Sequence, residues 1–323
     1  MENKTISLRE KGVRVLPSKK FMKITLILIL LIILLIEAFS VYIVFKFSHP
    51  KSINLQPNFK VYGIKDFEKV HFNSQKNDIS LSGYIIKNKG SKKTIIVCHG
   101  YGDSKFMVGG RTPSDVKIDN IRLAKLFLTQ GYNTLLFDFR GHGDYAGKNG
   151  VTIGYNEQQD LLGAINFVKS KGIGDKIGLI GFSMGAATSL SVLDKTKDIS
   201  FAIADSPFSD LKDYLNSNMK VWTGLPDFPF VPMIILNFKL IYGVDYSTVS
   251  PLNSVSKSNI PILLIHGKKD TTIPYTESAK MGKLLNNKKS KLVLFDNSTH
   301  VGSYSLYGDK YEAVLKEFLA SIN

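Results

Sequence analysis

The sequence predicts an α/β domain built on a mainly parallel β-sheet and preceded by one membrane-spanning helix. Beyond residue 66, short apolar runs alternate with longer stretches of helical periodicity, which is typical of parallel strands joined by helical crossovers. Before residue 50, one segment is apolar on every side and long enough to cross the hydrocarbon core of a bilayer. With 323 residues, the chain is long enough for one large domain and this appendage.

The apolar segment runs from Ile24 to Phe45, and Glu37 is its single charge. The apolar core of a signal peptide is normally only ~7–15 residues long and ends at a small-residue cleavage site. We therefore expect an uncleaved anchor over 24–46, with a cleaved signal peptide as the alternative. Residues 47–65 contain two prolines and no clear period, which indicates a linker.

Basic residues are concentrated before the span. Residues 1–23 carry seven basic and two acidic side chains, within a formal net charge of +15 for the chain. Because basic flanks stay on the cytoplasmic side, we expect 1–23 to be a cytoplasmic tail and the domain over 66–323 to be extracytoplasmic, at the cell membrane. Only 5 of the basic residues are arginine and 37 are lysine, which argues against base-specific recognition of nucleic acid.

Short runs that are rich in β-branched or aromatic residues and apolar on both faces indicate parallel strands covered by helices. They lie at 94–100, 134–139, 177–182, 201–206, 262–267 and 291–296, and helical patterns occur at 119–130, 156–170, 184–194, 275–286 and 308–322. Ahead of them, 69–74 and 79–86 predict an antiparallel hairpin, which gives a sheet of about eight strands. Cys98, the single cysteine, falls within a strand and is expected to be a buried apolar side chain.

One interval breaks the alternation of strands and helices. Residues 207–252 separate two strands by more than one helix requires, and they are rich in aromatic residues and interrupted by Pro226, Pro229 and Pro232. A long insertion beside the carboxyl edge of a sheet is typical of a lid or cap over a binding site. Ordinary helix packing without ligand contact is the alternative.

The stretch Gly181-Phe182-Ser183-Met184-Gly185 places a serine between a buried strand and a helix. A sharp strand-to-helix turn projects a hydroxyl towards a substrate carbonyl, and it brings strand and helix so close that side chains at both glycines would collide. The free N–H groups at the helix start also suit the oxyanion formed in acyl transfer. The pattern makes Ser183 a candidate nucleophile.

A serine nucleophile needs an imidazole base and an acid that orients the imidazole. His300 follows the last predicted strand, and Asp270 lies on the loop after the penultimate strand. Serine, acid and histidine then follow one another in the order found in α/β-hydrolases. Asp205, which ends the strand before the insertion, is the alternative acid. His99 and His142 are expected to brace loops beside the site.

An oxyanion hole needs two backbone N–H donors. Met184 provides one as the residue after the candidate nucleophile, and Tyr101, in the glycine-rich loop 99–103, is the best candidate for the other. No Cys/His cluster has metal-ligand spacing, so we expect neither a metal nor a cofactor.

Six stretches spread over 66–323 resemble the α/β-hydrolase superfamily, on the branch of prolyl-oligopeptidase-like serine hydrolases and membrane-anchored α/β-hydrolase domain proteins. These stretches are VCHGYGDS, LLFDFRGHGDYAG, GLIGFSMGA, ADSPFSDL, IPILLIHGKKDTTIP and STH. The resemblance implies the α/β-hydrolase fold and a serine esterase, lipase or peptidase with a Ser-Asp-His triad. The hairpin departs from the family pattern, because it lacks the usual Asp-Gly turn.

The sequence thus predicts a serine hydrolase that cleaves a carboxylic ester, thioester or amide through an acyl-enzyme. Its expected partners are a small-molecule, lipid or peptide acyl substrate and the membrane, through the N-terminal anchor. An acyltransferase with the same triad, or a non-catalytic binding protein on the same fold, is the alternative.

Overall fold

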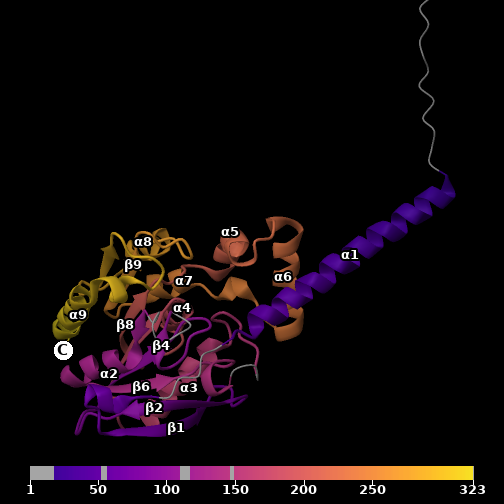
Figure 1. Ribbon diagram of the computed structural model, residues 1–323. Coiled ribbons are helices and arrows are strands. Elements are labelled where there is room, and N and C mark those ends of the chain that lie inside the picture. Colours follow the sequence, from indigo (N-terminus) through magenta and orange to yellow (C-terminus); the bar gives the residue numbers. More distant parts are fainter. Residues whose placement is uncertain (1–17, 52–56, 110–116, 146–148, 323) are drawn as a thin grey trace, which may run out of the picture.

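The computed structural model describes residues 18–51, 57–109, 117–145 and 149–322. One long helix projects from an α/β domain (Figure 1). Of the predicted cytoplasmic tail, residues 1–17 lie outside the described residues.

One eight-stranded sheet forms the centre of the domain, in the order β1-β2-β6-β3-β7-β8-β9-β10. β2 pairs antiparallel with β1 and with β6, and all other neighbours in this sheet pair parallel, which confirms the predicted fold class. The strands are β1 (Phe67–Asn73), β2 (Ser80–Ile86), β3 (Lys93–Cys98), β6 (Asn133–Phe137), β7 (Lys176–Phe182), β8 (Ile199–Asp205), β9 (Ile262–Gly267) and β10 (Lys291–Phe295). A separate pair, β4 (Met107–Val108) and β5 (Ile118–Asp119), was not predicted, because two residues show no periodicity.

Helices cover both faces of the sheet (Figure 1). They are α1 (Lys19–Ser48), α2 (Asn120–Thr129), α3 (Glu157–Ser170), α4 (Met184–Ser191), α5 (Leu211–Thr223), α6 (Asp227–Tyr242), α7 (Pro251–Lys257), α8 (Thr276–Gly282) and α9 (Ser303–Ile322), with short 3₁₀ turns η1 (Phe59–Tyr62), η2 (Gly143–Tyr145) and η3 (Tyr246–Thr248). The prediction of 275–286 was too long, since α8 ends at Gly282. The prediction of 308–322 was too short, because α9 begins at Ser303 and continues past a kink at the non-helical Tyr307.

Successive side chains of the central strands enter two different cores, because side chains alternate across a sheet. Ile96 and Cys98 of β3 face the core shared with α3 and α4, whereas Ile95 and Val97 face the core shared with α2 and α9. The strand is therefore apolar at every position from Ile95 to Cys98. Burial raises the pKa of the Cys98 thiol to about 12, so this cysteine is the packed apolar side chain that the sequence predicts.

α1 is long and apolar enough to cross a membrane, with a mean hydropathy of 3.0 over its most apolar 18 residues. Its start is capped by Ser18, whose hydroxyl accepts from the N–H of Phe21. A signal sequence near the N-terminus can meet the same criteria of length and composition, so the uncleaved anchor and its orientation stay predictions.

The C-terminal turns of α1 pack against α6 of the insertion. The Phe39 and Phe230 rings meet edge to face at 5.8 Å, and the Ser48 and Tyr242 hydroxyls hydrogen-bond at 2.7 Å. The described part of the predicted linker is also attached to the domain, because Phe59 is buried against other aromatic rings.

A buried ion pair holds the loop that follows β6. The Arg140 guanidinium donates to Asp160 on α3 at 2.7 Å and to Asp78 in the hairpin turn at 3.1 Å. The Asp160 side chain is fully buried, whereas that of Asp78 is 43% exposed. Water can therefore replace Asp78 as a partner of Arg140 more readily than it can replace Asp160.

We expect Asp160→Asn to lower the free energy of unfolding by about 3 kcal/mol, because it leaves the buried guanidinium without its main counter-charge. Asp78→Asn is the matched control, and its partly solvated pair contributes at most about 1 kcal/mol. Urea unfolding of the full chain in detergent measures both values. Equal losses in the two variants would contradict this assignment.

Candidate active site

Ser183 occupies the turn between β7 and α4. Its backbone has φ 52° and ψ −117°, a left-handed φ that a residue other than glycine rarely adopts and that stores strain. The Ser183 N–H donates to the carbonyl of Asp205 at the end of β8, which fixes the turn against the neighbouring strand. The side chain therefore projects from a tight, fixed strand-to-helix junction.

The two glycines of the turn permit a very close approach of strand, helix and the neighbouring loop. A Cβ at Gly181 would lie 2.4 Å from the carbonyl oxygen of Gly185, and a Cβ at Gly185 would lie 2.2 Å from that of Cys98. Both contacts are with backbone atoms, which cannot swing aside. The steric reason that the sequence suggested for these glycines is confirmed.

The structure brings Ser183, His300 and Asp270 together from three separate loops. His300 Nε2 lies 2.8 Å from Ser183 Oγ, and His300 Nδ1 lies 2.7 Å from Asp270 Oδ2. Because the carboxylate can only accept, Nδ1 carries the ring proton and Nε2 accepts from the serine hydroxyl. The imidazole is thus oriented as a base towards the serine.

His266, at the end of β9, is a second imidazole partner of Asp270, and the sequence analysis gave it no role in the site. Its Nε2 lies 3.2 Å from Asp270 Oδ2 and 2.9 Å from the Ile273 carbonyl, so this nitrogen carries the proton. Its Nδ1 then accepts from the Ser278 hydroxyl at 2.7 Å. The one sequence signal was the position of His266, four residues before the acid at a strand end.

The Asp270 carboxylate is stabilised in its ionised form. Burial by itself raises its pKa, but hydrogen bonds from His266 and His300 outweigh burial and bring the pKa well below its usual range. The N–H groups of Thr272 and Ile273 donate to the other carboxylate oxygen at 2.9 and 2.8 Å.

Asp205, the alternative acid, serves a different part of the fold. Its oxygens accept from the hydroxyls of Ser206 and Tyr311, both at 2.9 Å, and within the described part of the chain neither oxygen hydrogen-bonds to the His300 imidazole. Burial raises the pKa of Asp205, opposite to the shift of Asp270. The geometry therefore favours Asp270 as the partner of His300.

Two neutral imidazoles brace the glycine-rich loop beside Ser183. His99 donates from Nδ1 to the Gly100 carbonyl and accepts from the Phe139 N–H at Nε2. His142 donates to the Arg140 carbonyl and accepts from the Gly102 N–H at 3.0 Å. Burial lowers the pKa of both rings, which keeps them neutral and able to accept. The bracing contacts agree with the sequence prediction.

The candidate oxyanion donors lie at this loop and at the helix start. A Cβ on Gly100 would be 3.5 Å from the Cβ of Ser183, so the residue before Tyr101 directly adjoins the serine. Met184 is the first residue of α4, so its N–H is one of those without an acceptor inside the helix.

An aromatic cluster, defined here as Phe47, Tyr101, Tyr214 and Trp222, connects this loop to α1 and to the insertion. The Tyr101 and Trp222 rings are 5.7 Å apart, and the Tyr101 hydroxyl donates to the Phe47 carbonyl at 2.9 Å. Trp222 donates to the Tyr214 hydroxyl, which donates to the carbonyl of Thr272 beside Asp270. The insertion therefore contacts both the glycine-rich loop and the acid loop.

Comparisons with known proteins agree with this arrangement. A sequence profile described as "Prolyl oligopeptidase family" matches residues 121–322. YqkD of Bacillus subtilis, an uncharacterized protein, is 30% identical over 75% of this chain and 76% of its own length. The structure of the esterase Pf2001 of Pyrococcus furiosus superimposes with a TM-score of 0.68 and 28% identity, over 85% of this chain and 98% of the esterase. The lysophosphatidylserine lipase ABHD12 of Danio rerio is 25% identical over 62% of this chain and 53% of the lipase.

The lowered pKa of Asp270 predicts a pH-dependent contribution to stability. A depressed carboxyl pKa stabilises the fold above the unfolded value of about 3.9, and this stabilisation is lost as pH falls through the lower folded pKa. The difference in unfolding free energy between the wild type and Asp270→Asn should therefore narrow as pH falls below about 4. Urea unfolding of both proteins between neutral and acid pH measures this difference. A difference that stays constant with pH would contradict the stabilisation of the Asp270 carboxylate by its imidazole partners.

Proposed function

The chain belongs to the prolyl oligopeptidase family and is a hydrolase with the α/β-hydrolase fold, and on this premise we propose that Ser183, His300 and Asp270 are its catalytic triad. One observation supports the proposal above all others. An unbroken line of hydrogen bonds, of 2.8 and 2.7 Å, joins the serine hydroxyl through the imidazole to a buried carboxylate. Such a line is what general-base activation of a serine requires.

In the acylation step, Ser183 Oγ attacks the substrate carbonyl carbon while His300 Nε2 takes the hydroxyl proton. The bond from this carbon to the leaving oxygen, sulfur or nitrogen then breaks, and His300 returns the proton to the leaving group. Asp270 keeps the ring in the required tautomer and stabilises the imidazolium. Water activated by the same nitrogen then hydrolyses the acyl-enzyme.

The tetrahedral oxyanion would be held by the N–H groups of Met184 and Tyr101. Each such donor contributes on the order of 10²–10³ in rate in comparable enzymes. Support comes from the unpaired helix start at Met184 and from the rigid loop that His99 and His142 brace against Ser183.

We infer that the preferred substrate is an ester with an apolar acyl chain. The aromatic cluster offers an apolar wall next to the glycine-rich loop. α1 would hold this wall near a membrane, and a lysophosphatidylserine lipase is among the relatives. The domain organisation that we propose with it has an anchor over 24–46, a linker over 47–65, an extracytoplasmic domain over 66–323 and a cap at about 207–252.

Ser183→Ala should abolish labelling by a fluorophosphonate probe and lower ester hydrolysis by about 10³-fold or more, because it removes the hydroxyl that hydrogen-bonds to His300 Nε2. Ser189→Ala is the matched control, since its hydroxyl lies on α4, next to the serine turn, and donates to the Gly185 carbonyl. Labelling is read from a gel, and hydrolysis from p-nitrophenol release. A binding protein would give no labelling with either form.

Esters of increasing acyl length should be cleaved with rising kcat/KM, about tenfold or more from acetate to hexanoate, because each buried methylene contributes about 0.8 kcal/mol. Aminoacyl p-nitroanilides should be poorer substrates than the hexanoate ester. Faster amide cleavage would instead favour a peptidase. If an added alcohol captures most of the acyl group as a new ester, the protein is an acyltransferase.

A further inference from the structure

Helix α6 of the insertion has an exposed face that is apolar where a soluble protein would carry polar residues. Phe228 is 81% exposed, Leu240 71%, Leu236 52% and Ile241 49%, and the exposed charged residues of the helix are Asp227 and Lys239. Most helices at the surface of a domain expose their polar face to water. A set of large apolar side chains gathered on one helix instead indicates an interaction surface.

The opposite face of α6 is already in use, so the exposed face is not left over from a loosely placed helix. Val231, Ile234 and Phe238 are buried in the core of the domain. α6 also packs on the last turns of α1, through Phe39 against Phe230 and by the bond between Ser48 and Tyr242. Its outer face is therefore held in a defined position beside the long apolar helix.

The length of α1 places this contact at the edge of a bilayer. Side chains are exposed from Phe21 to Leu35, and Ser40 is the first fully buried one. The hydrocarbon core takes about 20 helical residues, so a span that starts at Ile24 ends near Ile43. α6 contacts α1 at Phe39 and at Ser48, on either side of this end, which puts it at the lipid–water interface.

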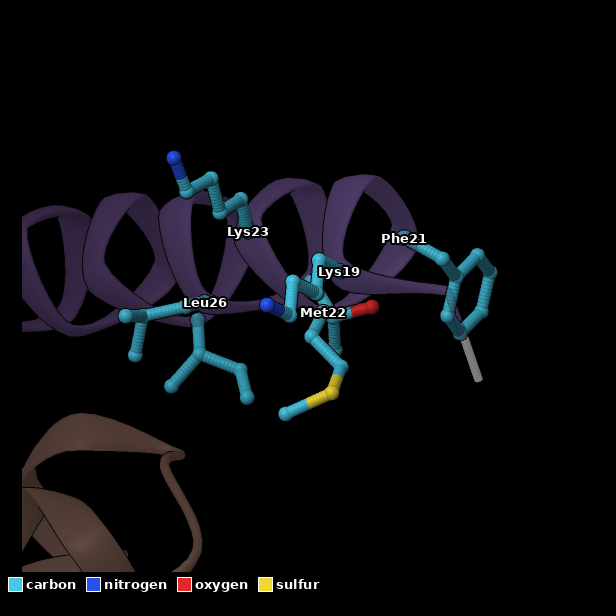
Figure 2. Close-up of a pocket in the computed structure, with 7 residues that line it drawn as sticks. Lys19, Phe21, Met22, Lys23 and Leu26 are labelled. Carbon is cyan, nitrogen blue, oxygen red and sulfur yellow. The ribbon is translucent and has the colours of Figure 1, made fainter. Parts of the chain in front are cut away.

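The other end of α1 also has the composition of an interface. Figure 2 shows Phe21, Met22 and Leu26 around its first turns, with Lys19 beside Met22 and the ammonium group of Lys23 on the other side of the helix. The described residues that line this hollow all belong to one helix, so it is a surface between exposed side chains and not a binding cavity. Lysines among apolar side chains can extend to the headgroups there.

We propose that the outer face of α6, formed by Phe228, Leu236, Leu240 and Ile241, is a second membrane-binding surface that enters the leaflet beside α1. The partner is the bilayer itself. Its recognition rests on apolar area, with Lys239 placed to reach the headgroups. This inference deepens the proposed function, on which its substrate part depends.

The surface is connected to the candidate site through two short routes. α6 follows α5, whose Trp222 donates to Tyr214, which in turn donates to the Thr272 carbonyl beside Asp270. The Tyr101 ring contacts Trp222, and its hydroxyl bonds the carbonyl of Phe47 in the last turn of α1. Immersing α6 therefore brings the insertion side of the site against lipid, where an amphiphilic ester can enter without crossing water.

The physical test measures the depth of α6 in lipid. The full chain with Leu240→Cys is labelled with the fluorophore NBD and reconstituted in phosphatidylcholine vesicles whose acyl chains carry nitroxide quenchers. Ala313→Cys on α9 is the control, because it is exposed at the opposite end of the domain from α6 (Figure 1). Cys98 is buried and should not react in the folded chain.

Quenching of the Leu240→Cys label with little quenching at Ala313→Cys is the expected result. Equal, weak quenching at both positions would place α6 in water and overturn the proposal. Weak quenching together with crosslinking between two Leu240→Cys chains would also overturn it, because a second copy would then cover the face. None of these readouts needs catalytic activity.

The functional test compares hydrolysis of a soluble ester with hydrolysis of an ester embedded in vesicles. Leu236→Glu combined with Leu240→Glu should leave hydrolysis of soluble p-nitrophenyl acetate within about twofold, yet lower hydrolysis of a long-chain ester embedded in vesicles by on the order of tenfold. Asn216→Glu with Ser217→Glu, on the exposed side of α5, adds the same charge and should change neither rate. Equal losses on both substrates in the α6 variant would contradict a membrane role. If the wild type cleaves neither ester, the proposed function fails while the quenching result still stands.

Discussion

The imidazole of His300 hydrogen-bonds to side chains on two loops that follow different strands, Ser183 and Asp270. The candidate site depends on these two hydrogen bonds. Ser183 follows β7, Asp270 follows β9 and His300 follows β10, with β8 lying between the first two in the sheet. Parallel strands end at a common edge, so residues far apart in the chain converge there. Two short hydrogen bonds then fix the ring, its tautomer and its distance from the serine.

The same edge of the sheet contains a strained backbone at Ser183 and a buried carboxylate at Asp270. A positive φ at Ser183 is energetically unfavourable by about 1–3 kcal/mol, and the bond from its N–H to the β8 carbonyl holds the turn in place. Asp270 is buried, yet His266 and two backbone N–H groups keep its carboxylate ionised. Reactive geometry is thus maintained by atoms that never meet a substrate.

The long apolar helix α1 and the candidate site share packed side chains. Phe47, in the last turn of α1, contacts both Tyr101 and Trp222, while Trp222 reaches the acid loop through Tyr214. α1 is therefore part of the packing around the site and not a tether joined by a free segment. The part of the predicted linker that the structure describes supports this reading, because Phe59 is buried in the domain.

The sequence alone determined the strands, the serine turn and the order of the three polar residues, because periodicity and turn sterics act over a few neighbouring residues. Asp205 ends a strand and Asp270 follows one, and nothing local shows which of them meets His300. Tertiary structure decided this pairing, because Tyr311 from the last helix donates to Asp205 while the β9 loop places Asp270 against His300. The contacts of His266 and the packing of α6 on α1 were equally beyond the sequence, since both join segments whose proximity depends on how the whole sheet and its insertion assemble.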